Sequence, residues 1–324
     1  MNANFIELKS YMQQHIVGQS KLIDRLIIGI LCGGHLLIEG LPGLAKTRSV
    51  QSLANGLDLD FQRIQFTPDL IPGDITGSDI FVPQDGQFRY LEGPLFNDII
   101  LADEINRAPP KVQSALLEAM QENQITVGGI TRPLSPLFMV IATQNPIEHE
   151  GTYPLPEAQL DRFFMKINID YPNTDDELAI LKMDQQHLQS KKDEKTSKTK
   201  SDSSLLSAKL ILEARDQVSA IYMDEMLERY IVTLVSATRN PGQWDNELAE
   251  TLKRGASPRA TLALAQAARA HAFLSQRDFV EPGDIVETAA DILRHRIALS
   301  FMAHGNSLNS DAIIKRILEC VPIP

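Results

Sequence analysis

The sequence predicts an α/β protein in which a three-layer α/β/α core with a parallel sheet is followed by a smaller, all-helical domain. Up to Tyr171, short apolar segments alternate with amphipathic helical patterns, as in a sheet covered by helices. After Pro172 apolar strands disappear and helical periodicity dominates. The 324 residues also exceed what one hydrophobic core usually serves. We therefore expect two domains, residues 1–172 and 173–324.

Apolar periodicity places most elements of the first domain. The expected segments are a helix over 20–31 with Ser20 as its N-cap, a strand over 36–38, a helix from about Lys46, a strand that ends the run 96–102, an amphipathic helix over 111–123, a hairpin over 125–134 about Gly128 and Gly129, and a strand over 137–143. The two long apolar runs are typical of strands that are buried on both faces.

The second domain is expected to consist of helices over 205–238, 257–276 and 284–300. They are preceded by the string SKKDEKTSKTKSDSS at 190–204, which is too polar to bury any surface. We expect this segment to be a flexible, solvated insertion.

Composition narrows the class of protein. Thirty-one basic and 42 acidic residues give a net charge of −11, which opposes sequence-independent binding to nucleic acid. The N-terminus has no basic region followed by a cleavage site, and no apolar run has the length of a membrane span, so we expect a cytoplasmic protein without membrane insertion. Cys32 and Cys320 are too few for a disulfide framework or a cysteine-based metal site.

The string EGLPGLAKT at 39–47 closely matches the phosphate-binding pattern G-x-x-x-x-G-K-[ST], except that Ala45 replaces the last glycine. In such a loop, backbone N–H groups at a helix N-terminus meet phosphate oxygens, Lys46 adds a charge, and the Thr47 hydroxyl ligates Mg²⁺. Alanine adds only a methyl group and fits if its φ is negative. The string therefore predicts a nucleotide site with a Mg²⁺ ligand, although a chance match to so degenerate a pattern is the alternative.

Two adjacent carboxylates end the apolar string IILADE at 99–104. At the carboxyl end of a buried strand, Asp103 would hold Mg²⁺ through water and Glu104 would act as the general base for the attacking water. The alternative is an ordinary acidic loop after a strand.

The string ATQNP at 142–146 follows the next apolar strand. Asn145 there could hydrogen-bond the attacking water or the γ-phosphate, although an asparagine before Pro146 is also a common turn residue. The segment 148–150 has a histidine between two glutamates, which could suggest a metal site. No second cluster in the sequence has metal-ligand spacing, so a solvated loop is the favoured interpretation.

Long strings across the chain resemble AAA+ ATPases, and among these the MoxR family, near the magnesium-chelatase ATPase subunit and the minichromosome-maintenance helicases. The strings are IVGQ at 16–19, GLPGLAKT at 40–47, RIQFTPDLIPGDITG at 63–77, ADEINRAPPKVQSALLEAMQE at 102–122, ATQNPIEHEGTYPLPEAQLDRF at 142–163 and GASPRA at 255–260. This family usually has alanine in place of the last loop glycine. The resemblance implies an AAA+ core with a helical lid domain.

The resemblance also implies roles for particular residues. Arg162 matches the arginine finger that reaches the γ-phosphate of the neighbouring subunit, where a surface ion pair would be the alternative interpretation. Arg259 matches sensor 2, with Ser257 capping its helix and Pro258 in the first position. The nucleotide-binding residues are Val17 and Gly18 at the adenine pocket, and Gly40, Pro42, Gly43, Leu44, Ala45, Lys46, Thr47 and Arg48 in the loop.

The resemblance implies a function as well. We expect a Mg²⁺-dependent ATPase that forms a ring, expected to be a hexamer, and remodels a client protein in a chaperone-like manner, with a von Willebrand factor A domain protein as partner. The insert at about 77–94 and the hairpin at 125–134 commonly face the ring pore in relatives. The alternatives are a nucleotide-gated scaffold with negligible turnover and a magnesium-chelatase-like subunit. No nucleic-acid partner is expected, because the chain is acidic.

Overall fold

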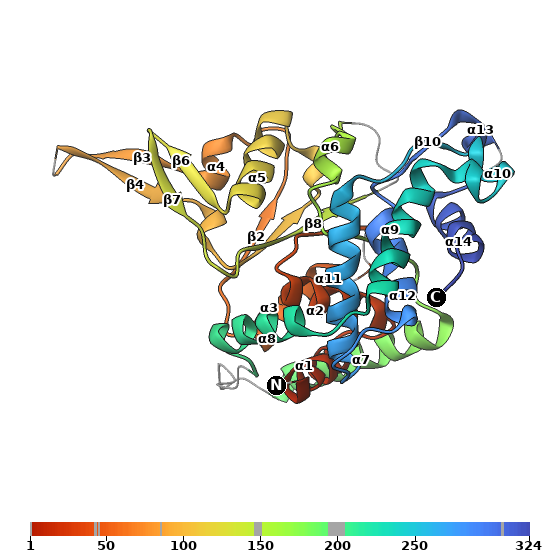
Figure 1. The fold of residues 1–324 in the computed structure, drawn as a ribbon. Helices are drawn as coiled ribbons and strands as arrows, with labels where there is room; N and C mark the ends of the chain where they lie inside the picture. Colours follow the sequence, from red (N-terminus) through yellow and green to blue (C-terminus); the bar gives the residue numbers. More distant parts are fainter. Residues whose placement is uncertain are drawn as a thin grey trace.

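A five-stranded parallel sheet forms the centre of the first domain, in the order β2-β5-β8-β1-β9 (Figure 1). The computed structural model describes residues 2–41, 44, 46–84, 86–145, 151–193, 205–305 and 308–324. The strands are β1 (Leu36–Gly40), β2 (Phe61–Gln65), β5 (Ile99–Asp103), β8 (Met139–Gln144) and β9 (Met165–Ile169). The parallel three-layer core predicted from the alternating pattern is confirmed.

Helices cover both faces of this sheet. Successive residues of β5 point to opposite faces, so Ile99 and Leu101 join the core on the side of α2, whereas Ile100 and Ala102 join the core on the side of α5. The helices of the first domain are α1 (Asn2–His15), α2 (Ser20–Cys32), α3 (Lys46–Gly56), α4 (Pro72–Thr76), α5 (Pro110–Glu122) and α6 (Glu157–Leu160). Ser20 is the first residue of α2 and Gln19 is its N-cap, without a side-chain cap bond, so the predicted capping role of Ser20 is wrong.

Two antiparallel hairpins extend from the core on the left of Figure 1. They consist of β3 (Gly77–Val82) with β4 (Gln87–Glu92), and β6 (Gln124–Val127) with β7 (Ile130–Pro133). Gly128 and Gly129 turn the second hairpin with φ of +60° and +77°, a region that glycine adopts without strain. The Arg132 guanidinium lies 3.7 Å above the Tyr90 ring, which joins the two hairpins.

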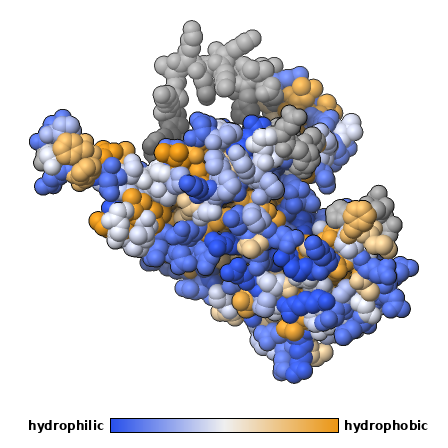
Figure 2. Space-filling view, turned by 90° about the horizontal axis from the view of Figure 1, so that it is seen from above, coloured by the Kyte–Doolittle hydropathy of each residue, from blue (hydrophilic) through white to orange (hydrophobic). Residues whose placement is uncertain are grey.

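The longer hairpin exposes apolar side chains. Phe81 and Phe88 pair across β3 and β4 with ring centroids 5.3 Å apart, and 54% and 71% of their surfaces are exposed. Figure 2 shows this projecting arm with hydrophobic side chains on its surface. Exposed aromatic pairs of this kind are typical of binding surfaces.

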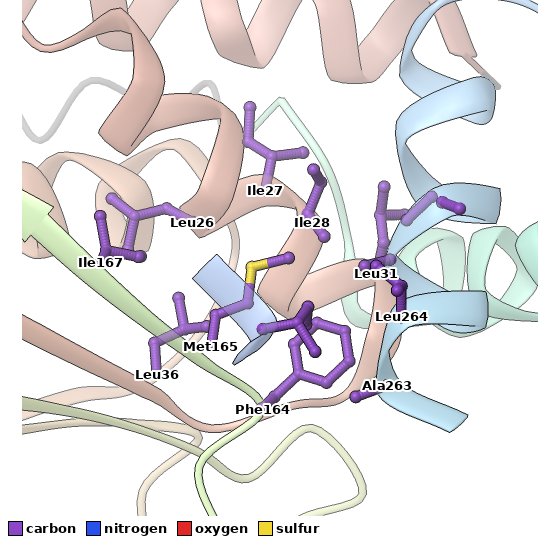
Figure 3. Close-up of a cluster of buried hydrophobic side chains, with 14 of the residues drawn as sticks. Leu26, Ile27, Ile28, Leu31, Leu36, Phe164, Met165, Ile167, Ala263 and Leu264 are labelled. Carbon is purple, nitrogen blue, oxygen red and sulfur yellow. The ribbon is translucent and has the colours of Figure 1, made fainter. Parts of the chain in front are cut away.

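The second domain packs against the first along α2 (Figure 3). Its helices are α7 (Thr174–Asp193), α8 (Ala208–Ala220), α9 (Glu225–Arg239), α10 (Asn246–Ala249), α11 (Pro258–Leu274), α12 (Pro282–Leu293), α13 (Phe301–Gly305) and α14 (Ser310–Cys320). Leu31 of α2 lies beside Leu264 of α11, in the buried cluster that also contains Phe164. A Cβ atom on Gly34 would come within 2.4 Å of the Phe164 ring, so only glycine fits beside this cluster.

The predicted helical stretches are confirmed with two changes. The stretch 205–238 is divided into α8 and α9, and α12 ends at Leu293, so the prediction of helix up to residue 300 is wrong. Ala298 and Leu299 instead form a short strand, β11, that pairs with β10 (Leu252–Arg254). Ser257 caps α11 as expected, because its Oγ accepts the N–H of Arg259.

The expected polar insertion at about 190–204 begins in the last turn of α7, and its remainder, 194–204, lies outside the described residues. Among the helices that the structure describes, none combines the length and the apolar composition needed to cross a bilayer.

Candidate active site

Three strands of the sheet end beside one another where the sequence predicted nucleotide chemistry. β1 lies next to β8, and β8 lies next to β5, with Glu39 opposite Gln144 and Ala102 opposite Ala142. Because these strands are parallel, the segments that follow Gly40, Asp103 and Gln144 emerge at the same edge of the sheet. The structure thus brings the phosphate loop, the two carboxylates and Asn145 to one edge.

Lys46 begins α3 immediately after the phosphate loop, and its Nζ donates to the Gly40 carbonyl at 2.7 Å. This bond folds the lysine side chain back over the loop. Thr47 and Arg48 follow in the first turn of α3. Pro42, Gly43 and Ala45 lie outside the described residues, so the predicted backbone cradle and the φ of Ala45 stay predictions.

A cavity of about 310 Å³ adjoins this loop and suits a purine ring. Its wall includes Val17, Leu44, Arg48 and, from α7, Ile180. Gly18 is not part of that wall. It has a φ of +76°, and a Cβ atom there would lie 2.9 Å from Asp176, which explains the glycine by backbone conformation and packing. The sequence analysis missed Ile180, since nothing in one chain's pattern brings α7 to this pocket.

Asp103 is buried and its two carboxylate oxygens have different partners. Thr143 Oγ1 donates to Oδ1 at 2.6 Å. Arg63 donates to Oδ2 through Nη2 at 2.6 Å and Nε at 3.1 Å. Oxygen ligands such as the Asp103 carboxylate and the Thr47 hydroxyl are those that Mg²⁺ prefers, and a cationic group already lies against Asp103. The residues present therefore fit a magnesium ion.

Glu104 has a φ of +59°, which is uncommon for a residue other than glycine and costs on the order of 1 kcal/mol. Its N–H donates to Thr143 Oγ1 at 2.9 Å. The same threonine hydroxyl thus contacts both carboxylate residues, because it donates to one and accepts from the other. This pairing holds the strained turn in place and fixes the position of Glu104 relative to Asp103.

The Glu104 side chain is engaged by two neighbours. Gln65 Nε2 donates to Glu104 Oε2 at 2.8 Å, and Arg107 Nε lies 3.1 Å from the same oxygen. Gln65 Oε1 in turn accepts from Arg63 Nη2 at 2.8 Å. Arg63 and Gln65, two residues apart on β2, therefore hold the two carboxylates in one hydrogen-bonded chain. The sequence analysis missed both, although their spacing puts them on one face of a strand.

Asn145 is buried at the end of β8, with 8% of its surface exposed. Its position at the edge shared with Glu104 is compatible with contact to a water or a phosphate oxygen, and equally with a turn. Pro146 to Glu150, including the histidine of the possible metal cluster, lie outside the described residues.

Arg162 lies at the opposite edge of the sheet. It precedes β9, whose first residue, Met165, pairs with Leu36 at the start of β1. A five-residue strand spans about 16 Å, so Arg162 is separated by that length from the phosphate loop of its own chain. Its Nη1 donates to the Leu117 carbonyl at 2.8 Å. This partner is a backbone carbonyl of α5, which differs from the surface carboxylate of the alternative interpretation.

Arg259 lies near Arg162. Its Nη1 is 3.6 Å from Asp161 Oδ2, and about half of its side chain, 53%, is exposed. Both arginines therefore lie at the amino edge of the sheet, where Arg162 is partly exposed and Arg259 about half exposed. The fold, together with a phosphate loop, paired carboxylates and these two outlying arginines, defines a P-loop ATPase of the AAA+ class.

Comparison with known proteins agrees with this class. Residues 35–165 match the ATPase family associated with various cellular activities (AAA), and residues 247–317 match the AAA lid domain. The chain is 43% identical to Chaperone MoxR1 of Mycobacterium tuberculosis over 95% of this chain and 79% of that protein. It is 39% identical to YeaC of Bacillus subtilis, over 97% and 93% of the two chains.

A solved crystal structure of a protein from Cytophaga hutchinsonii, assigned as an ATPase, superimposes with a TM-score of 0.90 at 46% identity and covers 100% of this chain and 96% of that one. The chain belongs to the MoxR family of AAA+ ATPases, and it is an ATPase.

Proposed function

We propose that this chain assembles as a ring, which we take to be hexameric, hydrolyses ATP with Mg²⁺ between neighbouring subunits, and uses the energy to remodel a client protein. One observation carries the proposal. The phosphate loop and the carboxylates follow the carboxyl ends of the strands, whereas Arg162 and Arg259 lie at the amino edge. A complete site therefore needs two copies of the chain.

Within one subunit, each side chain has a separate task. Lys46 would neutralise phosphate charge, and Thr47 and Asp103 would hold Mg²⁺, which polarises the phosphate oxygens when bound. Glu104 would accept a proton from the attacking water, and Asn145 would orient that water. Gln65 and Arg107 both contact Oε2 of Glu104, so Oε1 would be the oxygen that accepts this proton.

From the neighbouring subunit, Arg162 would stabilise the charge that develops on the γ-phosphate. Where measured in related chemistry, such an arginine is worth about a thousandfold or more in rate. Arg259 would contact the same nucleotide from the second domain, which would couple the orientation of that domain to hydrolysis.

The client is expected at the hairpin that carries Phe81 and Phe88. Support comes from their exposure and from the name of the relative Chaperone MoxR1. A von Willebrand factor A domain protein remains the expected partner on the basis of family resemblance. A nucleotide-trapped Glu104→Gln variant, used as bait with wild type as control, tests both: the proposal requires that it retain such proteins better in ATP than in ADP.

The decisive test uses turnover as a function of protein concentration. Wild-type activity per subunit should rise with concentration as subunits meet, whereas Arg162→Ala should stay slow, with turnover about a thousandfold below that of assembled wild type. Arg229→Ala is the matched control, because Arg229 is exposed and pairs with Glu225 on the surface of α9. If Arg162→Ala consumes ATP as fast as wild type at concentrations where both are assembled, the ring proposal is wrong.

The scaffold alternative makes a different prediction. A scaffold with negligible turnover would work equally well with Glu104→Gln, whereas the proposed motor would stop. Measuring client remodelling with this variant separates the two.

A further inference from the structure

Asp161 immediately precedes Arg162 in the chain, and its carboxylate is contacted by three side chains of the second domain. Ser257 Oγ lies 3.0 Å from its Oδ2 and 3.2 Å from its Oδ1. Arg296 Nε donates to Oδ1 at 3.0 Å. Arg259 Nη1 is 3.6 Å from Oδ2. One carboxylate of the first domain is therefore the common partner of three residues that lie far away in sequence.

Arg296 bonds to residues on both sides of Arg162 in the chain. Besides its bond to Asp161, its Nη2 donates to the Phe163 carbonyl at 2.6 Å and its Nη1 to the Phe164 carbonyl at 3.1 Å. The residue is 4% exposed, and burial lowers the pKa of its guanidinium to about 10, against the opposing effect of the Asp161 charge. The buried cation thus depends on Asp161 as its counter-ion.

Ser257 ties the start of α11 to the same carboxylate. Its Oγ accepts the N–H of Arg259 as the helix cap and donates to Asp161. The Asp161 carboxylate thus holds the Ser257 hydroxyl, and this hydroxyl holds the first turn of α11. The Arg259 side chain extends from that turn, so its direction depends on Asp161. Arg162 follows Asp161 directly in the chain, so both arginines take their position from one side chain.

We propose that Asp161 is a positioning residue that sets Arg162 and Arg259 relative to each other, so that both reach the nucleotide of the neighbouring subunit together. Ser257 and Arg296 belong to the second domain and bond to Asp161. A movement of that domain would therefore displace Asp161 and, with it, the adjacent Arg162. This inference rests on the proposed function of the two arginines.

The first test compares Asp161→Asn with Glu157→Gln. Asparagine keeps the size and one acceptor of Asp161 but removes the charge that pairs with Arg259 and Arg296. We expect kcat to fall between about tenfold and a hundredfold, the range that small misplacements produce. The KM for ATP should change little, because the phosphate loop lies at the other edge of the sheet.

Glu157→Gln is the matched control. It breaks the ion pair between Glu157 and Arg254, with oxygen and nitrogen 2.6 Å apart, which also joins the two domains. Both side chains are about half exposed, and neither contacts Arg162 or Arg259. This variant should keep wild-type kcat and KM.

Mixed assemblies separate positioning from folding. Asp161→Asn subunits retain a sound phosphate loop, and Lys46→Ala subunits retain sound arginines. Mixing the two should restore turnover at those interfaces where an Asp161→Asn subunit holds the nucleotide and a Lys46→Ala subunit supplies Arg162 and Arg259. Mixing Asp161→Asn with Arg162→Ala should restore nothing, because both lack competent arginines. A general folding defect would give no recovery with either partner.

Circular dichroism and gel filtration show whether Asp161→Asn is folded. If it is not, Asp161→Glu takes its place, because it keeps the charge and shifts the carboxylate by one methylene; the same loss of kcat and the same mixing pattern are then expected.

The two possible failures can be told apart. If Arg162→Ala abolishes turnover while the folded Asp161 variant behaves like Glu157→Gln, only the role of Asp161 is overturned. If Arg162→Ala leaves turnover unchanged, the proposed function and this inference fall together.

Discussion

Arg63 supplies Asp103 with a positive partner from within the chain. Its guanidinium lies 2.6 Å from the Asp103 carboxylate. A magnesium ion would bind the same carboxylate, either directly or through a water molecule. Because the Arg63 guanidinium and Mg²⁺ are both cations attracted to the Asp103 carboxylate oxygens, binding of one weakens binding of the other. The Arg63 side chain is 48% exposed, although that of Asp103 is only 12% exposed, so water weakens the ion pair from the side of Arg63.

Replacing Arg63 with glutamine should therefore lower the Mg²⁺ concentration needed for half-maximal turnover by severalfold. The reason is that Mg²⁺ no longer competes with a tethered cation. Titrating ATPase activity with MgCl₂ at fixed ATP measures this, and Arg229→Gln, a surface substitution on α9, serves as the control. An unchanged or higher Mg²⁺ requirement would contradict the competition.

His35 gives the stability a dependence on pH. Its Nδ1 accepts the N–H of Val140 at 3.0 Å and its Nε2 donates to the Met120 carbonyl at 3.0 Å, so the neutral ring fits the site. Burial lowers its pKa to about 4. Since the unfolded chain binds this proton near pH 6.5, stability is full above that pH and is lost as the pH falls toward 4, by about 3 kcal/mol in total.

His35→Gln should remove this part of the pH dependence, because an amide can donate and accept in the same way without titrating in this range. Urea unfolding at pH 7.5 and pH 4.5 measures the difference. His295, whose pKa burial lowers well below its usual value, leaves a remaining slope in the same direction. Equal pH slopes for wild type and variant would show that His35 does not titrate as inferred.

At the scale of elements, the hairpin of β3 and β4 carries apolar surface that its own fold does not need. Phe88 is 71% exposed, and surface substitutions of this kind usually change stability by less than about 0.5 kcal/mol. The double variant Phe81→Ser with Phe88→Ser should keep the wild-type Tm and basal turnover while it loses client binding. Cross-linking to a permanently unfolded protein, with the exposed Val232→Ser on α9 as control, would test this.

The sequence predicted those elements whose burial is uniform. β5 and β8 are apolar up to their polar carboxyl ends because helices cover both faces, and α2 shows a clear apolar stripe. β2 was missed because it is an edge strand with mostly exposed side chains. The end of α12 was predicted wrongly because Arg294, His295 and Arg296 continue a helical pattern, yet each is used for bonds to other elements.

The same reasoning applies to the site. Lys46, Asp103 and Glu104 could be predicted because each belongs to a local string at or just after the end of a strand. Arg63 and Gln65 could not be assigned, since their partners are 40 and 39 positions away and depend on β2 lying beside β5. Local patterns predict candidates for the chemistry, whereas the residues that hold these candidates in place depend on sheet order.

At the scale of the whole molecule, a buried ionic network joins the two domains. Arg25 of α2 donates to Asp291 of α12 at 2.7 Å, and Arg294 donates to the same carboxylate at 2.6 Å and to the Lys166 carbonyl of β9 at 2.6 Å. Arg25 and Asp291 are almost completely buried. Removing one partner of such a pair leaves an uncompensated charge.

Asp291→Ala should consequently destabilise the protein by about 3–5 kcal/mol. We expect wild type to unfold in one calorimetric transition, because the two domains share this network and the seam along α2, and the variant to show a lower Tm with a broadened or divided transition. Lys209→Gln, which removes an exposed pair with Glu213, should leave the transition unchanged. A sharp single transition at the wild-type Tm in Asp291→Ala would refute the coupling.

The separation of the phosphate loop and Arg162 by the length of the sheet also restricts symmetry. In a two-fold contact residue i of one copy meets residue j of the other and j meets i, so such a dimer could complete the proposed sites only if one patch held both the phosphate loop and Arg162. With the two groups at opposite edges of the sheet, the proposed function favours a heterologous, head-to-tail contact, and repeated contacts of this kind either close into a cycle or continue as a filament. The polarity of one β-sheet thereby favours a cyclic or filamentous active species over a two-fold dimer.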